Sequence, residues 1–127
     1  MRLKSLFKDL EYVGEAEGDR LSYAVFRGPD AYLVVAPNSR GGLNVNIVKR
    51  DIPEVIRKRF RGKRVTTTIV SKAGVPTKAR GWRSWGGKAS RRFDRFALLN
   101  GLYVMVALKW ARKLKEREGR SMVFKIA

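Results

Sequence analysis

The sequence predicts an α+β fold in which a four- to five-stranded antiparallel sheet packs on a long C-terminal helix, with a short basic helix between them. Two patterns carry this prediction. The first fifty residues alternate apolar and polar side chains with a period of two, between turn signals. From Ser90 to Glu118, apolar residues instead recur at three- and four-residue spacing. A chain of 127 residues suffices for one compact domain.

Four strands are expected before residue 50, arranged as an antiparallel meander. A short amphipathic helix over residues 5–10 precedes them, and Gly28-Pro29-Asp30 predicts a tight turn between the second and third strands. The third strand is mostly apolar, which suits a central strand that is buried on both faces. The expected strands cover residues 11–17, 21–26, 31–36 and 43–48.

The short basic helix is expected next. The segment Asp51-Ile52-Pro53-Glu54 suits a helix start, because Asp caps free amides, Pro is tolerated in the first turn and Glu suits the positive end of the helix dipole. Val55, Ile56 and Phe60 form the inner stripe of this helix. The β-branched run at residues 65–70 predicts a fifth strand.

The last part of the chain is expected to contain a loop, the long helix and a short strand. Residues 72–88 contain four glycines and show no period, which indicates a functional or mobile loop. Ser90 caps a helix that runs to about Glu118 and is closed by Gly119. The middle of this helix is apolar nearly all round, so we expect a second subunit to cover it. Residues 123–126 predict the final strand.

Positive charge is concentrated in residues 55–93, which contain thirteen Lys and Arg residues and no acid. Residues 1–54 are neutral, with eight bases and eight acids, and residues 94–127 contribute +5 to the net charge of +18. Within the basic stretch, Trp82 and Trp85 lie among glycines. A dense positive field interleaved with aromatic rings is what a polyanion with stackable bases requires. The sequence therefore predicts a nucleic-acid-binding protein.

We expect a single nucleic-acid-binding domain over residues 1–127. Residues 1–50 form the β-meander, residues 51–88 the basic helix, a strand and the Trp loop, and residues 89–119 the long helix, through which a homo-oligomer (dimer or tetramer) assembles. The N-terminus is too charged for a secretory signal and the uncharged run at 96–108 is too short to span a bilayer, which predicts a cytoplasmic, nucleoid-associated protein without a membrane partner. Abundant Lys and Arg with few thermolabile side chains indicate a thermophile.

The candidate nucleic-acid-binding residues are basic or aromatic. Arg and Lys neutralise phosphates, and a base stacked on an indole contributes about 1–3 kcal/mol in a sequence-tolerant way. For one of the two tryptophans the alternative role is a core anchor that holds the loop to the sheet. The candidates are Arg57, Arg59, Phe60, Arg61, Lys63, Arg64, Lys78, Arg80, Trp82, Arg83, Trp85, Lys88, Arg91 and Arg92.

Secondary candidates lie around the fourth strand. Asn44 and Asn46, with Lys49 and Arg50, are expected to share one rim of that strand and to line the same groove, although solvent-facing polar alternation explains the asparagines equally well. Arg40 lies near the tip of the preceding loop.

Four aromatic residues lie on the expected strands. An aromatic sheet face can stack bases, as in the RNP-type sheets that bind single-stranded RNA. The glycine- and aromatic-rich signature of that motif is absent, so core packing is the favoured role. These residues are Tyr12, Tyr23, Phe26 and Tyr32.

The composition argues against catalysis. Cys and His are both absent, which excludes disulfides, thiol nucleophiles, Cys/His zinc sites and imidazole acid–base chemistry. A metal-dependent nuclease needs clustered carboxylates, and the basic stretch contains none. Gly87-Lys88-Ala89 departs from a phosphate-binding loop at the hydroxyl position. We therefore expect no enzyme activity, no metal and no cofactor.

The favoured function is sequence-tolerant binding of single-stranded DNA, or RNA, through a basic groove and aromatic stacking. Two alternatives remain open. A ribosomal or RNP-associated protein that binds structured RNA fits the charge equally well. A double-stranded DNA architectural protein also fits it, but the Trp-rich loop is then poorly explained unless it intercalates.

Four N-terminal strands precede a basic helix, a Trp-containing basic loop and a long C-terminal helix, with the stretches Leu43-Asn44-Val45-Asn46 and Gly81-Trp82-Arg83-Ser84-Trp85. In this layout, over most of the chain, the sequence resembles the ThermoDBP-related archaeal single-stranded DNA-binding proteins. The resemblance implies a sheet backed by helices that forms a cleft lined with basic and apolar side chains. It also implies single-stranded DNA or RNA as the ligand, oligomers whose subunits together enclose the strand, and no catalysis. It assigns no individual residue.

Overall fold

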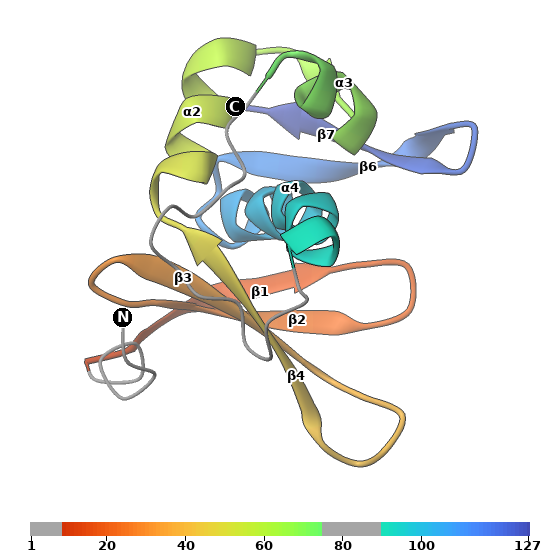
Figure 1. Cartoon of the computed structure of the whole chain (residues 1–127). Helices are drawn as coiled ribbons and strands as arrows, with labels where there is room; N and C mark the ends of the chain where they lie inside the picture. Colours follow the sequence, from red (N-terminus) through yellow and green to blue (C-terminus); the bar gives the residue numbers. More distant parts are fainter. Residues whose placement is uncertain (1–8, 75–89) are drawn as a thin grey trace.

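A computed structural model of the chain describes residues 9–74 and 90–127, with side chains from residue 97 onward in the second range. These residues form two antiparallel sheets with a helix between them (Figure 1). The four-stranded sheet has the order β1-β2-β3-β4 and the three-stranded sheet the order β5-β7-β6. The mixed α+β class and the N-terminal meander are thus confirmed, whereas the second sheet is a feature that the sequence did not predict. The expected helix over 5–10 falls mostly outside the described residues.

The described elements follow one another along the chain as four strands, two short helices around a two-residue strand, a longer helix and a final hairpin. They are β1 (Glu11–Glu17), β2 (Ser22–Arg27), β3 (Ala31–Pro37), β4 (Leu43–Lys49), α2 (Asp51–Phe60), β5 (Arg64–Val65), α3 (Thr67–Lys72), α4 (Ser90–Ala107), β6 (Ala111–Glu118) and β7 (Ser121–Ile126).

Strand β3 lies in the middle of the meander and is buried on both faces, as predicted. Tyr32 and Val34 are 2% and 0% exposed and belong to the main core. Ala31 and Leu33 alternate with them and are each 1% exposed on the opposite face, where they cluster with Ile47 of β4. Alternation of apolar side chains along a strand therefore builds two apolar clusters from one strand.

Strand β1 contains a bulge between Tyr12 and Gly14. Gly14 lies against the end of α4, because a Cβ added there would stand 3.1 Å from the backbone oxygen of Ala107. The absence of a side chain thus permits the close approach of β1 to the helix.

Helix α2 follows most of the predicted pattern in its buried stripe. Ile56 and Phe60 are buried in the main core as predicted, Val55 is only partly buried against it, and Ile52 is buried in addition. The predicted cap is wrong, because Asp51 is already helical and the capping position, Arg50, makes no side-chain cap hydrogen bond. The carboxylate of Asp51 instead pairs with Lys49 at 3.4 Å.

The predicted strand over residues 65–70 is wrong beyond its first residue. Thr66 adopts an extended conformation, and its hydroxyl oxygen accepts a hydrogen bond from the backbone N–H of Ile69 at 3.2 Å. This is an N-cap, which starts helix α3 and competes with extension of the β-branched run as a strand.

The predicted helix from Ser90 to Glu118 is wrong in its second half, because α4 ends at Ala107. Lys109 has a φ of 65°, and its N–H donates to the carbonyl of Val106 at 3.1 Å. The N–H of Trp110 donates to the carbonyl of Met105 at 2.8 Å. This pair of bonds is a Schellman motif, which terminates the helix and sends the chain into β6.

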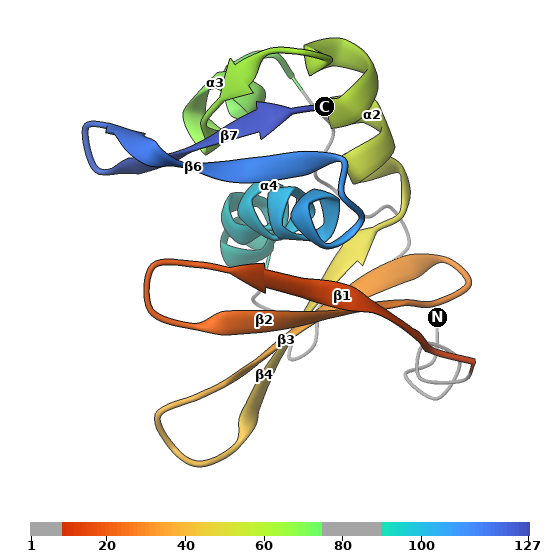
Figure 2. The same ribbon diagram turned by 180° about the vertical axis from the view of Figure 1, so that it is seen from behind.

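Helix α4 packs between the two sheets, as both views of the ribbon show (Figures 1 and 2). Leu102, Val104 and Met105 are each 0% exposed, and Phe124 of β7 and Val25 of β2 cover the helix from opposite sides within one core cluster. The apolar middle of the helix, which suggested a second subunit, is therefore covered largely by the β6–β7 hairpin and the meander of the same chain.

Candidate nucleic-acid interface

The described candidates gather in a basic segment, residues 57–64, which runs from the last turn of α2 into β5. The Trp-loop candidates lie outside the described residues, and for two further candidates only the backbone, in the first turn of α4, is described. The former are Lys78, Arg80, Trp82, Arg83, Trp85 and Lys88, and the latter are Arg91 and Arg92.

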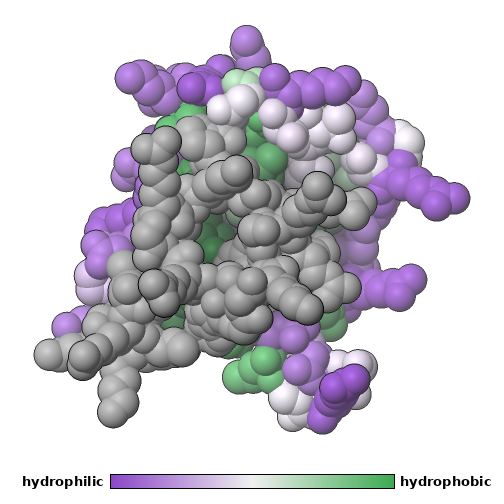
Figure 3. All heavy atoms as spheres, viewed as in Figure 1, coloured by the Kyte–Doolittle hydropathy of each residue, from purple (hydrophilic) through white to green (hydrophobic). Residues whose placement is uncertain are grey.

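The basic segment contains six Lys and Arg residues and no acid. All of these bases except Arg57 are exposed. Hydrophilic side chains accordingly gather along the upper margin of the surface above α2 and α3 (Figure 3). The only carboxylate that pairs with this segment within the described residues is Glu116, whose Oε1 lies 2.8 Å from Nη1 of Arg64. The segment therefore presents a largely uncompensated positive surface.

Two predicted binding residues in α2 have structural roles instead. Phe60 is 9% exposed and packs in the main core, so its ring offers no stacking surface. The guanidinium carbon of Arg57 lies 4.4 Å from the ring centroid of Trp110, a cation–π contact. Sequence reasoning assigned Trp110 to a long helix and missed this contact, because nothing in the local pattern links residues 57 and 110.

Arg59 ties the two short helices together. Its Nη1 donates a hydrogen bond of 2.9 Å to the carbonyl oxygen of Ala73, the C-cap of α3. A cation at this position also complements the partial negative charge of a helix C-terminus. Arg59 remains exposed, so this contact leaves part of its guanidinium open to a ligand.

The turn between α2 and β5 is fastened to the end of β7. The N–H of Gly62 donates to the carbonyl of Ile126 at 3.0 Å, and the N–H of Ile126 donates to the carbonyl of Lys63 at 2.9 Å. Gly62 has a φ of 77°, a conformation in which glycine is preferred. Arg61 and Lys63 therefore project from a backbone that is held on both sides of the turn.

The secondary candidates around β4 do not share one face. Asn44 and Asn46 pair with Ala36 and Val34, on the side of the sheet that faces α4. Lys49 alternates to the opposite side.

Two further secondary candidates make local contacts. The Nη1 of Arg50 donates to the carbonyl of Pro29 at 3.1 Å, and the N–H of Arg40 donates to Oδ1 of Asn38 at 3.0 Å within the β3–β4 turn. Among the described residues, neither Arg40 nor Arg50 forms a side-chain hydrogen bond or ion pair with the basic segment.

The four strand aromatics divide between the two faces of the meander. Tyr32 is buried, and Tyr23 stacks on Tyr103 of α4 with 4.4 Å between ring centroids. Tyr12 and Phe26 meet edge-to-face on the other side, where Tyr12 is 56% exposed. Core packing is confirmed for Tyr23 and Tyr32, whereas Tyr12 lies on the surface.

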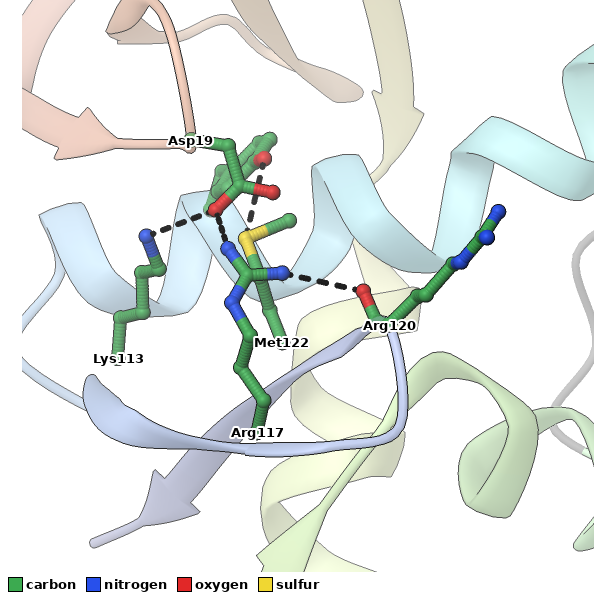
Figure 4. A network of polar contacts seen from close by, with 6 residues as sticks. Asp19, Lys113, Arg117, Arg120 and Met122 are labelled. Atoms are coloured by element: carbon green, nitrogen blue, oxygen red, sulfur yellow. Dashed lines mark hydrogen bonds and ion pairs between the residues drawn. The ribbon is translucent and has the colours of Figure 1, made fainter.

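Two basic side chains of β6, Lys113 and Arg117, pair with one acid of the β1–β2 turn (Figure 4). The carboxylate of Asp19, in the β1–β2 turn, accepts hydrogen bonds from Arg117 and from Nζ of Lys113, the latter at 3.4 Å. The bond from Arg117 is the main cause that holds the pKa of Asp19 below its ordinary value. Burial raises the pKa of the neighbouring Tyr103. These ion pairs connect the β1–β2 turn of the four-stranded sheet to β6 of the three-stranded sheet.

Among the described residues, no group of three or more carboxylates is placed to hold a metal ion. None of the described helices has the length and apolar character needed to cross a bilayer. Comparison with known protein families, with curated proteins and with solved structures finds no match for this chain. The resemblance to the ThermoDBP-related proteins therefore stays a prediction.

Proposed function

We propose that this protein binds single-stranded nucleic acid with little sequence preference, by neutralising phosphates along the basic segment. The observation that carries the proposal is that Lys58, Arg61 and Lys63 are exposed and form no ion pair with any described carboxylate. Closely spaced like charges repel one another, and an anionic partner relieves that repulsion.

The distribution of ion pairs supports this reading. Arg27, Lys49, Lys113 and Arg117 each pair with an acid on or beside the meander. The basic segment has only the pair between Arg64 and Glu116 within the described residues. Exposed cations without an ion pair to a described acid also occur elsewhere, as at Arg20, Lys115 and Arg120. The basic segment differs in placing Lys58, Arg61 and Lys63 close together along the chain with no acid between them.

The choice of a single strand rests on the sequence. Trp82 and Trp85 lie among glycines and basic residues in the sequence, their indoles suit base stacking, and stacking requires unpaired bases. A structured RNA is the second candidate, because the same exposed cations would neutralise its phosphates. Assembly into a homo-oligomer also stays a proposal, but α4 is packed inside the chain and no longer provides the argument for it.

A triple variant tests the proposal. Lys58→Ala/Arg61→Ala/Lys63→Ala should weaken binding to a labelled mixed-sequence single strand roughly tenfold or more, because three phosphate contacts are lost. The matched control is Arg20→Ala/Lys115→Ala/Arg120→Ala, which removes three exposed charges outside the basic segment. Fluorescence anisotropy measures both. Equal effects of the two variants would contradict a localised interface.

A further inference from the structure

We infer that Arg64, Lys125 and Arg112 form a cation row across the three-stranded sheet, and that this row binds successive phosphates of the nucleic acid. The register places Arg64 opposite Lys125 and Lys125 opposite Arg112. The three side chains therefore come from three adjacent strands, β5, β7 and β6. This inference rests on the proposed function and extends the interface to two residues, Lys125 and Arg112, outside the basic segment.

The cation row faces away from α4. The next register positions, Val65 and Phe124, are 0% exposed and belong to the main core. Because side chains alternate across a strand, Arg64, Lys125 and Arg112 lie on the outer face. Strands in a sheet are about 4.8 Å apart, so the row extends over about 10 Å of rigid backbone.

The cation row retains hydrogen-bonding capacity for a ligand. Lys125 donates one hydrogen bond from Nζ to the carbonyl of Gly62 at 2.6 Å, which leaves two of the three donors of its ammonium. Arg112 is exposed and forms no ion pair with a described acid. Glu116 compensates only Arg64, so the row has two positive charges that the described carboxylates leave unpaired.

Protection of sheet edges explains the row only in part. Charged side chains on edge strands hinder edge-to-edge aggregation, and β5 and β6 are the edges of this sheet. Lys125 lies on the central strand β7, where no such protection is needed. Like charges directly opposite one another on a sheet are destabilising. Binding of phosphates accounts for all three cations, including the central one.

The row is continuous with the basic segment. Arg64 belongs to both, and the reciprocal backbone bonds of Gly62 and Lys63 with Ile126 place the α2–β5 turn beside the end of β7. Figures 1 and 2 both show the end of β7 next to α2. A strand that lies on Lys63 can therefore continue over Lys125 towards Arg112, past the Arg64–Glu116 ion pair.

The salt dependence of binding tests the row. For a single strand, the slope of log K against log salt is about −0.7 per phosphate contact, so Arg112→Gln/Lys125→Gln should make it less steep by about 1.4. The control Arg20→Gln/Arg120→Gln also removes two positive charges, but at the β1–β2 and β6–β7 turns. Its slope of log K against log salt should equal that of the wild type.

Two further readouts separate the possible failures. Arg112→Glu alone leaves the Lys125–Gly62 contact in place and should still weaken binding, with circular dichroism confirming the fold. If wild-type protein binds and both row variants behave like the control, the row is overturned while the proposed function stands. If wild-type protein binds no single strand, the proposed function and the row fall together.

Discussion

The guanidinium of Arg57 lies over the ring of Trp110, with 4.4 Å between its carbon and the ring centroid. Arg57 belongs to the last turn of α2, and Trp110 stands between the end of α4 and the start of β6. Arg57 of the basic segment therefore connects α2 to the residue that precedes β6 of the three-stranded sheet. The neighbouring exposed cations remain available at the surface.

This contact predicts an energetic coupling between α2 and the residue before β6. Arg57→Ala and Trp110→Ala should each destabilise the fold, and a double-mutant cycle should show a coupling of about 0.5–2 kcal/mol. The same cycle with the exposed neighbour Lys58 in place of Arg57 should show a coupling near zero. Urea unfolding measures both cycles, and equal couplings would refute a specific cation–π contact.

The helix end at Lys109 predicts a stabilising substitution. A left-handed conformation costs a residue with a side chain about 1 kcal/mol, which glycine avoids, and Lys109 has a φ of 65°. Lys109→Gly should therefore raise the free energy of unfolding by up to about 1 kcal/mol. Lys58→Gly, inside α2, should lower it by about the same amount. Thermal unfolding should therefore show changes of opposite sign in the free energy of unfolding of the two variants. If Lys109→Gly destabilises the protein as Lys58→Gly does, α4 continues through residue 109.

The start of α3 depends on one hydroxyl. Thr66→Ala removes the acceptor of the bond from the N–H of Ile69 and should cost about 1 kcal/mol. Thr68→Ala, at an exposed position in the same helix, should change stability by less than about 0.5 kcal/mol. Chemical denaturation distinguishes them. A Thr66 variant as stable as the Thr68 variant would argue for the strand that the sequence predicts there.

The network around Asp19 predicts a loss of stability in acid. Its folded-state pKa lies below the ordinary value of 3.8, so its contribution is fully present above that pH and is lost as the pH falls through the folded pKa. The stability difference between wild type and Asp19→Asn should be constant near neutral pH and shrink below about pH 4. Unfolding at several pH values measures it, with Glu17→Gln as the control. A difference that stays constant into acid would rule out the ion pairs.

The N-terminal meander was predictable because its signals are local. Alternation of apolar residues marks β1, β2 and β4, a mostly apolar run marks β3, and Gly28-Pro29-Asp30 marks the turn before β3, so no information from distant residues is needed. The inner stripe of α2 was predictable for the same reason.

The helix from Ser90 and the final strand over 123–126 were predicted, whereas the segment between them, which forms β6, was mispredicted because the deciding contacts are not local. Ala111–Glu118 is rich in good helix formers, yet its strand conformation is set by pairing with Ser121–Ile126. The helix end before it is marked by Lys109, where a glycine would have been a visible signal. The apolar circumference of α4 was correctly noted, but the second sheet of the same chain covers it.

The positive charge of the candidate site was predictable from the sequence, but the spatial arrangement of its residues was not. The absence of acids in residues 55–93 is visible in the sequence, as is the cluster from Lys58 to Arg64. Neither the burial of Phe60 nor the alignment of Arg112 with Lys125 can be read without the tertiary fold. Because the sequence predicts a helix through residue 118, it gives no reason to expect Arg112 on one face of a sheet beside Lys125.

The most direct test of the proposed function compares a labelled single strand with its duplex at matched salt by fluorescence anisotropy. Wild-type protein should prefer the single strand, and Trp82→Ala/Trp85→Ala should lose that preference while the variant stays folded, because about 1–3 kcal/mol of stacking is removed per base. Equal or tighter binding of the duplex by the wild type would contradict the account and favour an architectural DNA-binding protein, and weak binding to both would favour a structured RNA.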